Sequence, residues 1–171
     1  MRWPISLCLV CLLTLLTACT SAPKGIAPVQ GFELSRYLGT WHEVARLDHG
    51  FERGLSRVSA EYQLRADGGV RVINRGFDAQ SQSWKTAEGK AYFVETPDIG
   101  HLKVSFFGPF YGAYVIYRLD ADYQYAFVTS YNRDYLWLLA RTPEVDESVR
   151  QAFATQAETL GFDTQALIWN Q

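Results

Sequence analysis

Cysteine thiols supply nucleophilic, redox and metal-binding chemistry. The 171-residue chain has three cysteines, Cys8, Cys11 and Cys19, and all of them lie within its first 19 residues. Because the rest of the chain has none, a thiol nucleophile, a cysteine–zinc site or an internal disulfide is not expected there. Cys8 and Cys11 lie inside an apolar run, whereas Cys19 ends it.

Other catalytic motifs are missing from the sequence. It contains no G-x-S-x-G nucleophile elbow, no glycine-rich phosphate loop and no H-E-x-x-H zinc motif. The three histidines are isolated from one another, and a surface or pocket-rim position explains each of them better than a metal site: His42, His49 and His101. We therefore expect no catalytic residue, no metal site and no cofactor, which favours a binding protein over an enzyme.

Residues 1–18 have the layout of a secretory signal peptide. Arg2 supplies a positive charge, and an apolar run from Ile5 to Leu16 follows it. This run is too short to cross a bilayer, which takes about 20 apolar residues. The segment is therefore expected to direct export rather than to span a membrane.

The signal ends in Leu16-Thr17-Ala18-Cys19, which is an aliphatic residue, two small residues and a cysteine. This pattern resembles the lipobox of bacterial lipoproteins. The resemblance implies that Cys19 becomes the first residue of the mature protein and carries a lipid on its thiol. It also implies attachment to the outer membrane on the periplasmic side, because Thr20 stands where inner-membrane lipoproteins typically have aspartate. An ordinary signal peptide with a chance cysteine is the alternative.

Residues 19–31 are expected to form the lipidated cysteine and a flexible tether. The segment Thr20–Gly31 has two prolines, two glycines and no apolar period. Fully extended, it reaches at most about 40 Å. The domain that begins at residue 32 should therefore stay close to the membrane.

From Tyr37 onward, short runs of alternating apolar and polar residues predict strands with one buried face. The runs are separated by segments rich in Gly, Pro, Asp and Asn, which favour tight hairpins. Asp48–Gly54 is longer and could form a lid-like loop. The eight predicted strands are Thr40–Leu47, Ser56–Leu64, Val70–Phe77, Thr86–Val94, His101–Phe106, Ala113–Leu119, Tyr125–Ser130 and Tyr135–Arg141.

The pattern changes at Thr142-Pro143-Glu144. Thr142 is a plausible N-cap, Pro143 suits the first helical position, and Gly161 is placed to end the helix. Between them, apolar residues recur at helical spacing and predict one amphipathic helix. Ala166–Trp169 is long enough for a short added strand.

Size and charge restrict the class of protein. Residues 32–171 make one domain, and a net charge of −2 with pI near 5.9 argues against binding nucleic acid. Short connections favour an all-β, antiparallel, up-and-down arrangement, and eight such strands can close into a barrel that removes exposed sheet edges. The expected fold is an eight-stranded antiparallel β-barrel with one C-terminal α-helix.

Two elements of the sequence resemble the lipocalin family. Gly39-Thr40-Trp41 in the first strand is similar to its G-x-W motif, and Arg141 at the end of the last strand is similar to its lone arginine. The resemblance implies that Gly39, Trp41 and Arg141 meet at the closed end of the barrel, with the arginine over the tryptophan ring.

Longer stretches resemble the bacterial outer-membrane members of that family, and the similarity covers essentially all of residues 32–171. The middle T-D-Y motif is replaced by Thr129-Ser130-Tyr131, which removes the basis for borrowing partner binding from animal lipocalins. The stretches are Tyr37–Trp41, Phe51–Leu55, Gly89–Phe93, Lys103–Gly112, Arg133–Trp137 and Arg141–Pro143.

The resemblance implies a ligand cavity for fatty acids or lysophospholipids, used for storage or transport in membrane maintenance. A lipid-modifying enzyme and a carrier of another hydrophobic ligand such as a tetrapyrrole are the rivals, and a homodimer is a further expectation. Aromatic density and strand alternation select six cavity candidates: Phe106, Tyr114, Ile116, Phe127, Trp137 and Leu139.

Charged side chains on or beside the predicted strands have a simpler interpretation. The carboxylates are expected on a solvated face or in rim salt bridges: Glu43, Glu61, Glu88 and Glu95. Three cations could meet a ligand phosphate or carboxylate at the mouth, although the barrel exterior fits them better: Arg75, Lys90 and Arg118.

Overall fold

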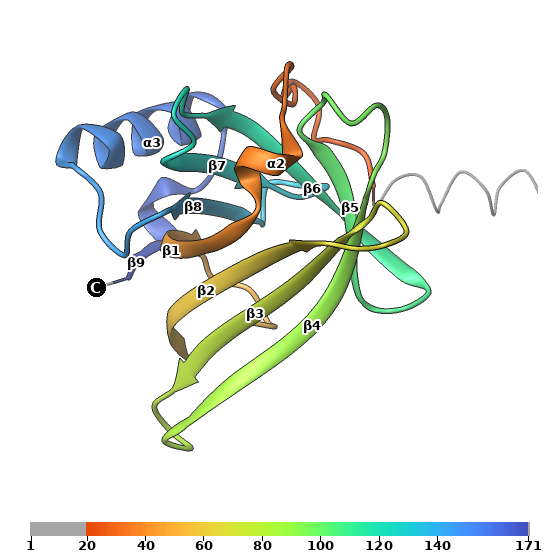
Figure 1. The fold of residues 1–171 in the computed structure, drawn as a ribbon. Helices are drawn as coiled ribbons and strands as arrows, with labels where there is room; N and C mark the ends of the chain where they lie inside the picture. Colours follow the sequence, from red (N-terminus) through yellow and green to blue (C-terminus); the bar gives the residue numbers. More distant parts are fainter. Residues whose placement is uncertain (1–19, 171) are drawn as a thin grey trace, which may run out of the picture.

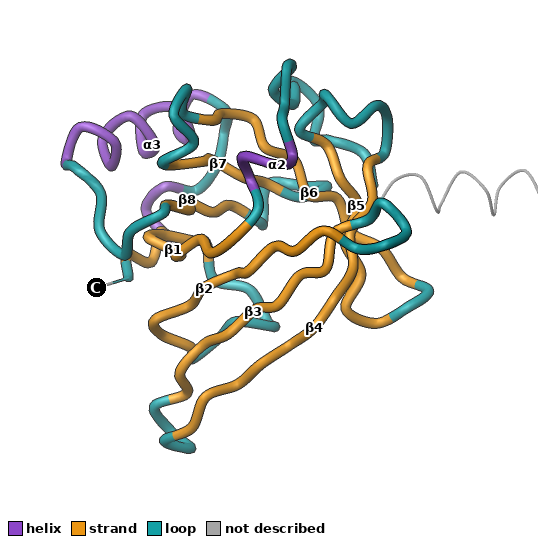
Figure 2. The backbone as a smooth tube through the Cα atoms, viewed as in Figure 1, coloured by secondary structure: helices purple, strands orange, loops and turns teal. Residues whose placement is uncertain are grey.

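The computed structural model describes residues 20–170, so the expected signal peptide and Cys19 lie outside the described residues. Strands are the main regular element of the domain (Figure 1, Figure 2). The elements are α2 (Leu34–Tyr37), β1 (Gly39–Leu47), β2 (Leu55–Leu64), β3 (Val70–Asp78), β4 (Ser83–Phe93), β5 (His101–Phe107), β6 (Phe110–Leu119), β7 (Tyr125–Thr129), β8 (Leu136–Ala140), α3 (Glu147–Thr159), a 3-10 turn (Thr164–Ala166) and β9 (Leu167–Trp169).

Strands β1 to β8 form a closed antiparallel barrel. Each strand pairs with the next, and β1 completes the circle because it pairs with both β2 and β8. Trp41 is thus opposite Ala60 of β2, while His42 is opposite Ala140 of β8. The short strand β9 pairs antiparallel with Ala45–Leu47, the last three residues of β1. The predicted fold class is confirmed, and so is the added strand after the helix.

The meander places alternate loops at the two ends of the barrel. We call the end that carries the β1–β2, β3–β4, β5–β6 and β7–β8 loops the open end. The opposite, closed end is covered by the segment around α2, where the Glu33 amide donates to the Tyr123 hydroxyl at 3.0 Å. Phe32 packs there against Tyr37, with ring centroids 5.2 Å apart.

Two hydrophobic cores hold the domain together. One lies inside the barrel and includes Trp41 and Val128, and the other lies between the barrel and α3 and includes Phe127 and Phe153. Strand alternation explains the division, because successive side chains of β7 point to opposite faces. The barrel, α3 and the members of both cores named here all lie within residues 20–170.

The helix begins later than the sequence predicts. Thr142 does not cap it, because its hydroxyl donates to the Glu144 carbonyl at 2.6 Å and forms a turn instead. The helix starts at Glu147 with Asp146 in the N-cap position. Gly161 does end it, with φ +82° in the left-handed region that favours glycine.

The segment Thr20–Gly31 differs from the flexible tether that its composition predicts. Ile26 is buried in the core beneath α3. Val29 is fixed on both sides, because its amide donates to the Ile116 carbonyl and its carbonyl accepts from the Gly100 amide, each at 2.9 Å. Burial of apolar side chains and these backbone bonds hold the segment along the barrel wall.

Candidate ligand-binding cavity

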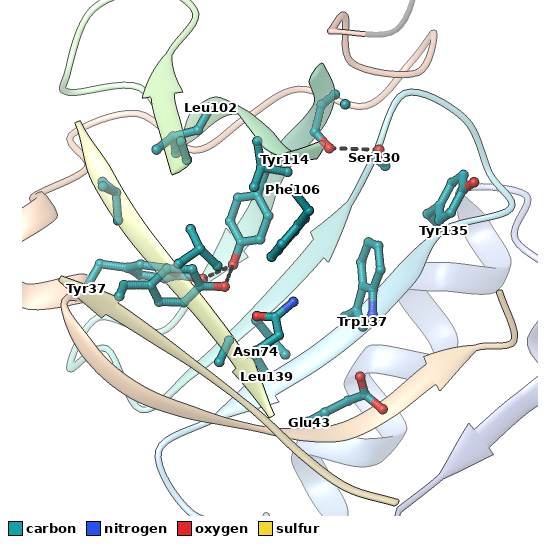
Figure 3. Close-up of a pocket in the computed structure, with 18 of the residues that line it drawn as sticks. Tyr37, Glu43, Asn74, Leu102, Phe106, Tyr114, Ser130, Tyr135, Trp137 and Leu139 are labelled. Carbon is teal, nitrogen blue, oxygen red and sulfur yellow. Dashed lines mark hydrogen bonds between the residues drawn. The ribbon is translucent and has the colours of Figure 1, made fainter. Parts of the chain in front are cut away.

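The barrel encloses a cavity of about 260 Å³ (Figure 3). Its wall is mainly apolar, and the side chains come from most strands and from the β1–β2 and β7–β8 loops of the open end. Apolar walls with a few placed polar groups are typical of sites for small hydrophobic molecules. The apolar wall includes Phe32, Leu34, Val58, Ala60, Val70, Val72, Ala91, Leu102, Val104, Phe106 and Leu139.

Four of the six residues that the sequence predicts for the cavity lie on its wall. They are Phe106 from β5, Tyr114 from β6, and Trp137 and Leu139 from β8 (Figure 3). Trp137 and Leu139 are two residues apart on one strand, so alternation turns both to the inside.

The prediction is wrong for Phe127 and Ile116. Phe127 points out of the barrel and packs under α3, with its ring centroid 5.0 Å from that of Phe153. Ile116 belongs to the interior core but lies outside the cavity wall, close to Gly100. The β6–β7 pairing also shifts register between Ile116 and Arg118. Strand parity misassigned Phe127, whereas it gave the inward direction of Ile116 but not its distance from the cavity.

Three tyrosine hydroxyls meet inside the cavity. The Tyr114 hydroxyl oxygen lies 2.8 Å from that of Tyr37 and 2.8 Å from that of Tyr62 (Figure 3). Burial raises the pKa of all three, so the phenols stay neutral at physiological pH. Three O–H groups share two mutual contacts, which leaves one hydroxyl proton to donate elsewhere. The three tyrosines, called the trio below, thus place a polar group in a mainly apolar wall.

The β1–β2 loop, residues 48–54, contributes to the cavity at the open end, as its length suggests. Phe51 and Glu52 both line the cavity. The Phe51 ring stacks on His49 with centroids 4.1 Å apart, and His49 packs against Trp137 at 5.1 Å. These contacts hold the loop against the barrel, with Phe51 half exposed to solvent.

A buried ionic network lies beneath that loop. Arg46 donates to Oε1 of the Glu43 carboxyl group at 2.6 Å, and the His49 Nε2 atom lies 3.0 Å from Glu52 Oε2. Trp137 donates to the same Glu52 oxygen at 3.1 Å. All four ionisable side chains are at least nine-tenths buried. Glu43 is therefore neither on a solvated face nor in a rim salt bridge, and the sequence interpretation of it is wrong.

The two carboxyl groups of this network differ in protonation. Burial, followed by the charge of Glu52, raises the pKa of Glu43 from an ordinary 4.5 to about 8, although Arg46 opposes the change. Burial also acts to raise the pKa of Glu52. The interactions with His49 and the hydrogen bond from Trp137 outweigh it and hold the Glu52 pKa below its ordinary value. At neutral pH, Glu43 is therefore mostly protonated and Glu52 ionised.

The three cations Arg75, Lys90 and Arg118 lie away from the cavity, whose described wall contains no lysine or arginine. Arg118 lies on the outside, 5.3 Å from the Phe127 ring centroid, and donates to Gln156 of α3. Arg75 and Lys90 are both exposed. The barrel exterior, the simpler expectation, is where these side chains lie.

At the closed end, the structure brings Gly39, Trp41 and Arg141 together. The Arg141 Cζ atom lies 4.1 Å from the centroid of the fully buried Trp41 ring. Arg141 also donates to the carbonyls of Thr40 at 3.0 Å and Arg36 at 2.7 Å. Gly39 has φ +93°, a conformation that L side chains rarely adopt. This group lies outside the cavity wall and closes the barrel beneath it.

Several residues that line the cavity were not predicted from the sequence. Tyr37, Tyr62 and the carboxylates Glu43 and Glu52 all line the wall. Glu43 stands two residues after Trp41 on the same strand, so its inward direction follows from the inward tryptophan. Nothing in the sequence pattern identifies the loop residue Glu52.

Residues 20–170 contain neither clustered metal ligands nor a membrane-spanning helix. No group of three or more histidine, cysteine, aspartate or glutamate side chains is arranged to hold a metal ion there. No helix in this part of the chain is long and apolar enough to cross a membrane.

A closed up-and-down barrel with an internal apolar cavity and an arginine stacked on a first-strand tryptophan defines a class of small-molecule binding proteins. The chain matches the lipocalin-like domain over residues 32–171. It therefore belongs to the lipocalin family, and the resemblance identified from Gly39-Thr40-Trp41 and Arg141 is confirmed.

Close relatives share a single name. The chain is 55% identical over 158 residues to the outer membrane lipoprotein Blc of Vibrio cholerae serotype O1, a match that covers 92% of each chain. It is 50% identical over 159 residues to the outer membrane lipoprotein Blc of Escherichia coli (strain K12), covering 92% of this chain and 90% of that one.

Solved structures share the fold at much lower identity. Insecticyanin from the tobacco hornworm Manduca sexta has a TM-score of 0.68 at 21% sequence identity, over 88% of this chain and 86% of that chain. At this identity the similarity concerns the fold alone.

Proposed function

We propose that this chain is a lipid-binding lipoprotein of the outer membrane that faces the periplasm. Its cavity holds the acyl chain of a fatty acid or lysophospholipid, which the protein stores or transports for membrane maintenance. The observation that carries the proposal is the cavity of about 260 Å³ inside the closed barrel, with an apolar wall and the Tyr37, Tyr62 and Tyr114 hydroxyls as its polar point. An apolar chain with one polar end matches such a wall.

The location in the outer membrane has separate support. Relatives at 50 and 55% identity are named outer membrane lipoproteins. The Leu16-Thr17-Ala18-Cys19 sequence supplies the cysteine that would carry the lipid. Several fatty chains on one cysteine hold a protein to a membrane durably, whereas a single chain does so only marginally.

The ligand is bound without chemical change in this proposal. Tyr114 contacts two tyrosine hydroxyls, and Glu52 contacts His49 and Trp137, so these polar groups of the cavity already have protein partners. Membership of a family of binding proteins supports the same conclusion. The expected homodimer rests on the family resemblance, and sedimentation of the purified protein tests it.

Native mass spectrometry of the lipoprotein purified from its own membrane tests the proposal. The expected result is a complex with one single-chain amphiphile of unaltered mass. Recovery of a cleaved or isomerised lipid would support an enzyme instead, and recovery of a ring compound such as a tetrapyrrole would contradict the proposed ligand class.

A further inference from the structure

The exposed large hydrophobic side chains of residues 20–170 are concentrated at one end of the barrel. Eight such side chains are exposed, and five of them lie at the open end. We call these five the rim patch: Phe51, Trp84, Phe107, Phe110 and Tyr131. Exposed apolar side chains gathered on one surface mark sites of interaction with a membrane or with another protein.

The tip of the β5–β6 hairpin is the most exposed part of the rim patch. Phe107 is 79% exposed and Phe110 is 75% exposed, and the two are paired across the hairpin. Neither of them lines the cavity, although Phe106 does. Their exposure is therefore not explained by ligand binding.

Basic side chains accompany the aromatic rings of the rim. The Arg57 guanidinium lies 4.3 Å from the Phe77 ring centroid and 5.0 Å from that of Trp84. On the other hairpin, the Lys103 ammonium lies 5.4 Å from the Tyr111 ring centroid. Aromatic rings with long basic side chains beside them suit a bilayer interface, where the rings sit at headgroup level and the cations reach phosphates.

The start of the described chain provides a second argument for a bilayer. Thr20 follows the cysteine expected to carry the lipid, and its carbonyl oxygen lies 2.8 Å from His101 Nε2 at the start of β5. Because Ile26 and Val29 are fixed to the barrel, an anchor at residue 19 would hold this wall near the membrane. In the view of Figure 1, the described chain begins on the side toward which the β5–β6 hairpin projects.

We propose that the rim patch, led by Phe107 and Phe110, docks on the phospholipid bilayer that holds the lipid anchor. The chain then touches the membrane at two places, its lipidated end and its open end. Docking brings the mouth of the cavity to the lipid surface, so that a ligand passes between bilayer and barrel with little exposure to water.

Vesicle binding by residues 20–171, produced without the preceding segment, tests this surface separately from the anchor. The probe is large unilamellar vesicles of phosphatidylethanolamine and phosphatidylglycerol, with partition measured by co-sedimentation. The double variant Phe107→Ser/Phe110→Ser should partition at least tenfold more weakly than the wild type. Leu64→Ser is the matched control, because Leu64 is 63% exposed at the closed end and should leave partition unchanged.

A second readout places the hairpin directly. Residues 20–171 contain no cysteine, so Phe107→Cys and Leu64→Cys each give one site for an environment-sensitive fluorophore. With vesicles, the label at residue 107 should shift to the blue and be quenched by nitroxide-labelled phospholipid. The label at residue 64 should show neither effect.

Three outcomes would overturn the proposal: no vesicle binding by the wild type, equal binding by the Phe107→Ser/Phe110→Ser variant, or equal loss in Leu64→Ser. A rim patch that instead joins two copies of the chain would show as loss of a dimer in the double variant, without vesicle binding by the wild type. Palmitate binding, measured on the same samples, should be retained by every variant. If the wild-type protein does not bind palmitate, the proposed function is contradicted, whereas the docking surface is not.

Discussion

The guanidinium of Arg141 lies over the indole of Trp41, with its Cζ atom 4.1 Å from the ring centroid, and 100 positions separate the two residues in the sequence. The pair joins the first strand of the barrel to the segment that follows the last. Since Trp41 is fully buried and Arg141 also donates to carbonyls of Thr40 and Arg36, the contact fixes the closed end beneath the cavity.

We expect Trp41→Ala to lower the free energy of unfolding by about 3–5 kcal/mol, the usual cost of removing a large buried aromatic side chain. Arg141→Ala should cost less, because Arg141 is partly exposed. Denaturant unfolding of both single variants and the double variant should give a coupling energy of about 0.5–2 kcal/mol. Strictly additive effects would show that the stacked pair contributes nothing.

Cys19→Ser should abolish membrane attachment and leave the domain folded. The proposed lipid is added to that thiol, and the strands of the barrel and α3 lie between Gly39 and Trp169, well after it. The measurement is fractionation of cells after a high-salt wash, with circular dichroism of the recovered protein. If the variant still fractionates with membranes like the wild type, Cys19 is not the anchor.

Tyr114→Phe should destabilise the domain by about 1–3 kcal/mol, because Tyr37 and Tyr62 both lose the hydroxyl that they contact. Tyr117→Phe is the matched control on the same strand. The Tyr117 hydroxyl is buried without a partner, so its removal should be neutral or slightly stabilising. Equal losses in the two variants, measured by urea unfolding, would contradict the role of the trio.

The pH dependence of stability should change in Glu43→Gln. Glu43 has a pKa raised from 4.5 to about 8 on folding, so the stability that it contributes is complete below pH 4.5 and is lost as pH rises toward 8. Between these values, the wild type should lose stability relative to the variant by at most about 1.4 kcal/mol per pH unit. A difference between the two proteins that is constant from pH 5 to 8, measured by urea unfolding, would show that Glu43 stays ionised.

The barrel could be predicted from the sequence because most strands alternate and their turns are chemically distinct. Phe127 could not be assigned, because β7 is buried on both faces and alternation there carries no direction. Ile116 points into the barrel as alternation from Tyr114 implies, but it lies outside the cavity wall. The position of Thr20–Gly31 also escaped prediction. Two prolines and two glycines suggest a free segment, yet the burial of Ile26 and the backbone bonds of Val29 help to fix it on the barrel.

The polar part of the cavity shows a different limit of sequence reasoning. Glu43 and Glu52 are nine residues apart and come together only because the β1–β2 loop folds back over the barrel. The partners of the network, Arg46 and His49, are equally unremarkable in the sequence. Burial changes their chemistry, and burial depends on tertiary packing that local periodicity does not contain.

The central claim is that the cavity holds one acyl chain. Each buried methylene contributes about 0.8 kcal/mol, so a long chain gains on the order of 10 kcal/mol before ordering costs are subtracted. Two chains need a wider interior than eight strands readily give.

A competition titration between single-chain and two-chain lipids tests this claim most directly. Trp137 lines the cavity and reports occupancy through its fluorescence. Fatty acids and lysophospholipids should bind more tightly than two-chain phospholipids and should be recovered with unchanged mass. Tighter binding of the two-chain phospholipids would contradict the account.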